Sequence, residues 1–175
     1  MIAGFVISSF LGLLLLVLAT RSFHNTALFG ISLSAFSFSA AISASLFSKL
    51  NRFYSYSFIY YTGLLIIGTG ICLSGISTTQ YGVVLSAALA GAAGFGNPLE
   101  QTILQKQTSE KNAGHVFTAL PAIRFGAGSL GLLVTGLLTE YYNVNKILFL
   151  EGGLLIITAV SGWFIAPLKK NTVYK

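Results

Sequence analysis

The sequence predicts an all-α membrane protein, a single domain over residues 1–175 that is a bundle of six transmembrane helices. Of the 175 residues, 54% are hydrophobic and only 8% are charged, whereas a soluble domain carries about 25% charged residues. The apolar residues also form runs close to the roughly 20 residues that a helix needs to cross a bilayer. The predicted spans are residues 2–19, 27–48, 56–77, 82–99, 115–138 and 145–167.

Continuous apolar runs distinguish these spans from the strands of a membrane β-barrel. Barrel strands are segments of about 10 residues with alternating polarity, whereas residues 11–18 are apolar without alternation. For the first run, a signal peptide is the alternative, but such a peptide begins with a basic region. No Lys or Arg precedes Arg21, so we interpret residues 2–19 as the first span.

The basic residues predict the orientation of the bundle. Seven of the ten Lys and Arg residues lie in the second, fourth and sixth polar segments, and two lie in the first, third and fifth. The larger group is Lys49, Arg52, Lys106, Lys111, Lys169, Lys170 and Lys175, and the smaller is Arg21 and Lys146. Because cytoplasmic loops are enriched in Lys and Arg, we expect a plasma (cytoplasmic) membrane protein with both termini in the cytoplasm.

The composition argues against catalysis and against cofactor binding. The four acidic residues are all Glu, and His24 and His115 are expected on opposite faces of the membrane. Hydrolysis within a membrane needs a Ser–His pair, paired Asp or a metal set. Cys72 is the only cysteine, so it forms no internal disulfide or zinc site. We expect no enzyme activity, cofactor or metal, and no nucleic-acid partner, because the basic loops suit anionic lipid.

A glycine-rich pattern lies in the fifth span. Gly126, Gly128 and Gly131 match GxGxxG, but dinucleotide binding requires that pattern to follow a strand and open a helix. Small residues also recur at every fourth position of this span, at Ala127, Gly131, Thr135 and Thr139. We therefore predict that this segment packs closely against another helix.

Two prolines predict irregular helix geometry. Pro121 lies about two turns into the fifth span, where a proline kinks the helix or loosens its first turns. The Asn97–Pro98 dipeptide is expected to mark the inner end of the fourth span, where the helix breaks or bends.

Arg124 and Glu151 are the charged residues that lie well inside the predicted spans. A central Arg costs about 2.5–3.5 kcal/mol on insertion scales, so it needs a partner or a wet cavity. One hypothesis pairs Arg124 with Glu151 in a central cavity. In the alternative, Arg124 snorkels toward the inner surface and Glu151 toward the outer one.

Gln105, Ser109 and the run Gly114–His115–Val116 precede a helix rich in small residues. This segment, residues 97–138, resembles the loop between the tenth and eleventh helices of major facilitator superfamily transporters. In the branch that exports drugs, macrolides and siderophores, that loop commonly reads Q-x3-P-x4-G-R-V. Gln105, Gly114 and Val116 keep this spacing, while Ser109 replaces the Pro and His115 replaces the Arg. Residues 29–52 also look like the eighth helix of that branch, with its basic exit loop.

This resemblance implies that the spans correspond to helices seven to twelve, the C-terminal half of a major facilitator fold. It implies membrane transport by alternating access, here ion-gradient-driven export (efflux) of a small amphipathic compound between two halves. Arg124 and Glu151 are then candidates for the transport path. The expected partners are the lipid bilayer, the small-molecule substrate, and a separate N-terminal half-transporter or a second copy of the chain. The alternative function is a non-transporting small membrane protein, or an inactive transporter fragment, that acts by helix–helix association.

Overall fold

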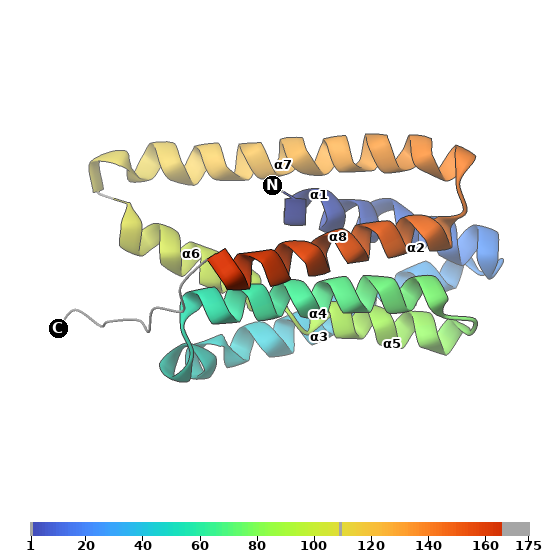
Figure 1. The fold of residues 1–175 in the computed structure, drawn as a ribbon, viewed down its shortest axis with the longest axis horizontal. Coiled ribbons are helices and arrows are strands. Elements are labelled where there is room, and N and C mark those ends of the chain that lie inside the picture. Colours follow the sequence, from blue (N-terminus) through green and yellow to red (C-terminus); the bar gives the residue numbers. More distant parts are fainter. Residues whose placement is uncertain (1, 109, 166–175) are drawn as a thin grey trace.

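The computed structural model describes residues 2–108 and 110–165, and every regular element in these ranges is a helix (Figure 1). The elements are α1 (Ile2–Ser9), η1 (Phe10–Leu14), α2 (Leu15–Val17), η2 (Leu18–Ser22), α3 (Thr26–Phe53), α4 (Tyr56–Ile76), α5 (Gln80–Gly91), α6 (Gly96–Gln107), α7 (Glu110–Tyr141) and α8 (Val144–Ile165). The first four follow one another without a gap and form the first helix, in which η1 and η2 are π-helical turns.

Five helices in the described ranges are long and apolar enough to cross a membrane, and α5 is a shorter apolar helix. The long segments are Ile2–Ser22, Thr26–Phe47, Tyr56–Ile76, Gly114–Tyr141 and Val144–Phe164. In a bilayer only helices of this kind satisfy every backbone hydrogen bond within the segment. The prediction of an all-α, multi-pass membrane protein is therefore confirmed.

The fourth predicted span is divided between α5 and α6. The break falls after Gly91, because this part of the chain lies directly on α3. A Cβ atom at Gly94 would be 2.5 Å from the Cα of Ala40, and one at Gly91 would overlap the carbonyl oxygen of Phe36. Pro98 lies just beyond the break, in the first turn of α6, where its missing N–H costs nothing. The helix therefore breaks earlier than the Asn97–Pro98 dipeptide suggests and then continues through residues predicted to be a loop.

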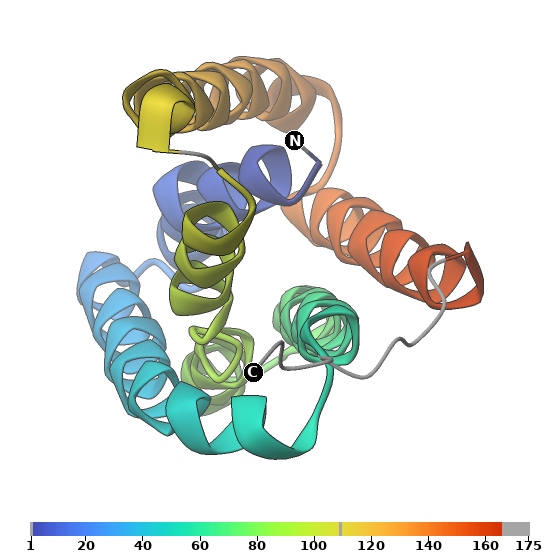
Figure 2. The same cartoon turned by 90° about the vertical axis from the view of Figure 1, so that its left-hand side faces the viewer.

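The fifth predicted span is the long helix α7. It begins at Glu110 instead of residue 115, and it continues through Pro121 without a break. In Figures 1 and 2, α7 lies along the outside of the first helix, and α3 lies along the outside of α5. The spans in α3 and α7 are only 11% and 17% buried, compared with 44% for α4. These two helices are therefore the least covered spans of the bundle.

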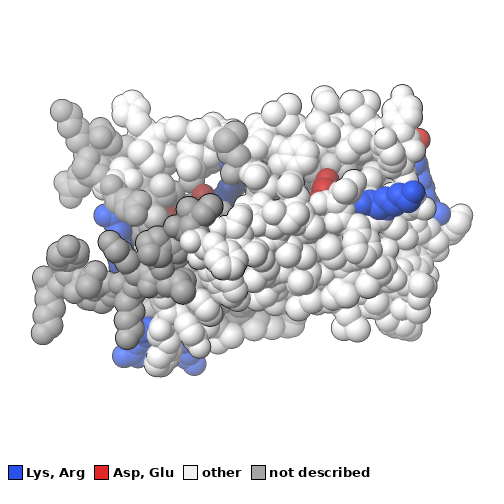
Figure 3. All heavy atoms as spheres, viewed as in Figure 1, with Lys and Arg blue, Asp and Glu red and all other residues white. Residues whose placement is uncertain are grey.

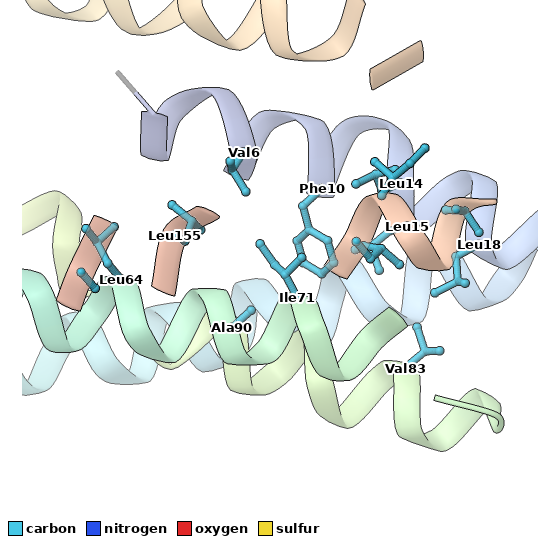
Figure 4. Close-up of a cluster of buried hydrophobic side chains, with 14 residues drawn as sticks. Val6, Phe10, Leu14, Leu15, Leu18, Leu64, Ile71, Val83, Ala90 and Leu155 are labelled. Atoms are coloured by element: carbon cyan, nitrogen blue, oxygen red, sulfur yellow. The ribbon is translucent and has the colours of Figure 1, made fainter. Parts of the chain in front are cut away.

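The main core lies where the first helix, α4 and α8 meet. Figure 4 shows Phe10 of the first helix pointing toward Ile71 of α4, with Leu155 of α8 beside them. All three side chains are fully buried. The surface away from this core is covered by exposed Leu, Ile, Phe and Tyr side chains, as is expected of a protein whose solvent is lipid.

The chain reverses direction alternately at the two ends of the bundle (Figure 1). At one end, Asn25 Nδ2 donates to Gln80 Oε1 at 3.1 Å, which joins the beginnings of α3 and α5. At the other end, Lys106 Nζ donates to Tyr56 Oη at 2.7 Å. Lys and Arg gather at both ends, and the middle of the face drawn in Figure 3 is mostly uncharged. The cytoplasmic orientation stays a prediction, and Lys169, Lys170 and Lys175 lie outside the described residues.

Candidate functional site

An ion pair links α6 and α7. Arg124 Nη2 contacts Glu100 Oε2, and the two side chains are 49% and 28% exposed. The stem of Arg124 lies against α1, since a Cβ atom at Gly4 would be 3.4 Å from Arg124 Cγ. Three helices, α1, α6 and α7, therefore meet at this pair.

The predicted pairing of Arg124 with Glu151 is wrong, because Arg124 pairs with Glu100. Glu151 is only 7% exposed, and its Oε1 atom accepts a hydrogen bond from Thr135 Oγ1 at 2.7 Å. Glu151 therefore lies in a closed junction between helices, and it does not reach toward the outer surface as the snorkelling alternative requires.

Three cavities meet at the Glu100–Arg124 pair, and both residues line all three. The largest, about 320 Å³, also includes Tyr60 of α4. A second, of about 250 Å³, extends from Tyr60 toward α3 and α5. The smallest, about 130 Å³, includes Pro121 one turn before Arg124. The walls of the 250 Å³ cavity are mainly apolar, and they include Ile7, Leu11, Phe36, Leu64, Ile67 and Phe95.

The pair thus forms a charged end to an otherwise apolar space. A neutral pair of opposite charges can bind a polar or charged group of either sign by exchanging one partner for the ligand. The apolar walls can bury the remainder of such a ligand. This combination suits a molecule with one polar end and a hydrophobic body.

The glycines of α7 divide into two groups. A Cβ atom at Gly128 would lie 2.6 Å from Ser8 Oγ, and one at Gly131 would lie 2.6 Å from the carbonyl oxygen of Phe5. These two glycines therefore allow α7 to approach the first helix closely. Gly126 has no atom within 4 Å of its added Cβ in the described part of the chain, so the packing role predicted for it has no counterpart there.

The four residues of the predicted cytoplasmic loop motif lie on helices. Gln105 is in the last turn of α6, and Gly114, His115 and Val116 are in the first turns of α7. None of them lines the three cavities at the ion pair. Ser109, which replaces the proline of the pattern, lies outside the described residues.

The sequence interpretation missed Glu100 and Tyr60. Glu100 lies one residue beyond the predicted fourth span, residues 82–99, and so falls in a segment expected to be a loop. Proline is favoured in the first turn of a helix. The sequence is therefore also compatible with a helix that has Pro98 in its first turn and includes Glu100. Tyr60 carries no sequence signal, because a tyrosine in an apolar span is equally common at a membrane surface.

The comparisons with known proteins agree with this architecture. The chain matches the family model of the Major Facilitator Superfamily over residues 1–173. It is also 30% identical over 98 residues to the MFS-type transporter olcL of Penicillium canescens, an alignment that covers 55% of this chain. That alignment spans only 17% of the fungal protein's own length. Members of the matched family are transporters and not enzymes. Since the family match extends over almost the whole sequence, this chain belongs to the major facilitator superfamily.

Proposed function

We propose that this chain is the C-terminal half of a membrane transporter and that it takes part in the export of a small amphipathic compound. The observation that carries the proposal is the Glu100–Arg124 pair at the meeting point of largely apolar cavities. An ionised pair inside a membrane protein is costly and commonly marks a substrate or ion pathway. The apolar walls fit the body of the substrate, and the pair fits its polar end.

The incomplete coverage of α3 and α7 supports the assignment to one half. These helices are the least buried spans, and a transporter of this family has its substrate path between two halves. We propose that the opposite wall is an N-terminal half of the same fold or a second copy of this chain. The further parts of this proposal are a plasma membrane location, cytoplasmic termini and the use of an ion gradient.

The proposal can be tested by transport into inverted membrane vesicles. Vesicles would contain this chain alone or together with an N-terminal six-span half, and an imposed pH gradient would drive uptake of fluorescent amphipathic dyes, one cationic and one anionic. We expect uptake of at least one dye. We expect Arg124→Gln and Glu100→Gln to reduce it at least tenfold, and Lys146→Gln to leave it unchanged. Lys146 is a matched control because it is exposed and lines none of the three cavities.

The vesicle preparation that shows uptake identifies the partner of this chain. Uptake by this chain alone, together with crosslinked dimers in the membrane, would indicate a homodimer, and uptake that requires the N-terminal half would indicate that such a half forms the opposite wall. Absence of uptake in both preparations would contradict the transport proposal and would favour a fragment that acts by helix association. Full uptake by Arg124→Gln would contradict the assigned path.

A further inference from the structure

We propose that Glu151 is a proton-binding site at the junction of α1, α7 and α8, and that its bound proton keeps these helices together. The site is separate from the cavities at Arg124. Glu151 lies on α8, its hydrogen-bond donor Thr135 lies on α7, and the buried Ser9 of α1 lies nearby, where its hydroxyl donates to the Phe5 carbonyl oxygen. Three helices thus enclose the carboxyl group.

The described residues around Glu151 place no positive charge against an ionised carboxylate. Thr135 donates to Oε1, while Oε2 is buried and has no hydrogen-bond partner among the described residues. The described residues form no ion pair with Glu151. An unpaired carboxylate in such a place costs several kcal/mol, and the group avoids this cost by binding a proton. The neutral carboxylic acid is therefore the form that fits this junction.

The elements packed around α8 carry other ionisable groups near Glu151. From α4, Cys72 lies against Gly152, the residue after Glu151. From η2, Arg21 Nη1 donates to the carbonyl oxygen of Thr139 at 2.9 Å, one turn beyond Thr135. On α8 itself, Lys146 is exposed and more than one turn away. None of these groups forms a charged contact with the carboxylate.

Loss of the proton has a structural consequence at this junction. The carboxylic acid releases one proton to water and becomes a carboxylate, which then requires donors that the closed junction does not supply. Water can reach Oε2 only if α8 separates from α7 or from the first helix. The first helix is irregular at this point, since the π-helical turn η1 begins directly after Ser9, and single π-helical turns occur frequently at functional sites.

Helix α7 connects this junction with the cavities. Thr135 and Arg124 lie on the same uninterrupted helix, so a movement of α7 at Thr135 is carried to Arg124. The protonation state of Glu151 would thereby be coupled to the binding of substrate. This consequence rests on the proposed transport function, whereas the proton site itself can be measured without transport.

The test uses infrared difference spectroscopy of the chain in lipid bilayers while the pH is raised. We expect the carbonyl stretching band of a protonated carboxylic acid to disappear as the pH rises. This band should be absent in Glu151→Gln and retained in Glu140→Gln, in which an exposed carboxyl at the end of α7 is replaced. Thr135→Val should shift the band, because the hydrogen bond to Oε1 is lost, and this variant keeps the test valid if Glu151→Gln does not fold.

A wild-type spectrum without a titrating band, or a band that persists unchanged in Glu151→Gln, would overturn the proton site. Coupling is tested in vesicles with the dyes described above. We expect Glu151→Gln to reduce the dye accumulation that a pH gradient drives at least tenfold, and to retain the exchange of labelled for unlabelled dye. Equal loss of both activities would contradict a coupling role. If the wild type transports nothing but its band titrates and disappears in Glu151→Gln, the transport proposal fails and the proton site stands.

Discussion

Glu100 on α6 and Glu151 on α8 are both carboxyl groups that contact α7, and their surroundings differ. Glu100 is partly exposed, pairs with Arg124, and borders three cavities. Glu151 is buried and is hydrogen-bonded to the hydroxyl of Thr135. Both partners belong to α7, about 16 Å apart along its axis at 1.5 Å per residue. The surroundings of Glu100, beside Arg124, therefore suit a charged carboxylate, and those of Glu151, beside Thr135, suit a protonated carboxylic acid.

The packing of α7 explains this difference. At Gly128 and Gly131, α7 touches the first helix so closely that a single added methyl group would collide with it. Gly126 lies on another side of α7, about 200° around the helix from Gly128, where it is exposed and an added Cβ atom meets no atom of the described residues. Glu151 is buried beside this close contact, whereas Arg124, which also lies against α1, borders cavities lined by α4 and α6. One helix thus has a closed segment and an open segment.

The largest expected effect comes from filling the closed segment. Gly131→Leu places a side chain against the Phe5 carbonyl and the Ser9 hydroxyl, and we expect it to lower the free energy of unfolding by about 3 kcal/mol, the upper part of the range for overpacking. Gly126→Leu, five residues earlier on the same helix, should change it little. Size-exclusion chromatography of the fluorescently tagged variants after heating measures the difference. Equal thermal stability of the two variants would show that α7 is not in close contact with the first helix.

The next largest effect concerns exchange of the charges in the open segment. We expect Glu100→Arg and Arg124→Glu each to reduce vesicle uptake at least tenfold, which equals about 1.4 kcal/mol. The double variant should recover part of the uptake, because the pair is restored in the opposite sense. The stability of Arg124→Gln should change by less than about 1 kcal/mol, since partly exposed ion pairs contribute little. Failure of the double variant to exceed both single variants would argue against a functional pair.

A smaller effect is expected for the hydroxyl groups of the closed segment. Thr135→Val removes the hydrogen bond to Glu151, and interhelical hydrogen bonds in membrane proteins contribute about 0.6 kcal/mol on average and up to about 1.7 kcal/mol. Thr139→Val is the matched control, because Thr139 Oγ1 bonds only the Gly136 carbonyl of its own helix. Reversible unfolding in detergent should show the larger loss for Thr135→Val. A larger loss for Thr139→Val would contradict the assigned contact.

Much of the fold could be predicted from the sequence, because lipid imposes a simple rule. Long apolar segments must be helical in a bilayer, so five of the six predicted runs coincide with the five helices that are long and apolar enough to span in the described ranges. The break between α5 and α6 could not be predicted in the same way. It follows from the contact of Gly91 and Gly94 with α3, and a contact between segments about 50 residues apart has no local signature.

Less of the site could be predicted. The cost of a central arginine correctly indicated that Arg124 needs a partner or a cavity. The partner was sought on the following helix in the sequence, but the bundle places α6 beside α7 and brings in Glu100. The burial of Glu151 depends on which face of α8 meets α7, and the apolar sequence around it does not distinguish one face from another.

The contrast between an open and a closed segment is tested most directly by aqueous thiol labelling in intact membranes. In a Cys72→Ala background, Ala3→Cys would report on the cavities, and Ser9→Cys, on the same helix α1, would report on the closed junction. We expect a charged methanethiosulfonate reagent to label position 3 readily and to leave position 9 unlabelled at neutral pH. Equal labelling of both positions, or faster labelling at position 9, would contradict the division of α7 into an open and a closed segment.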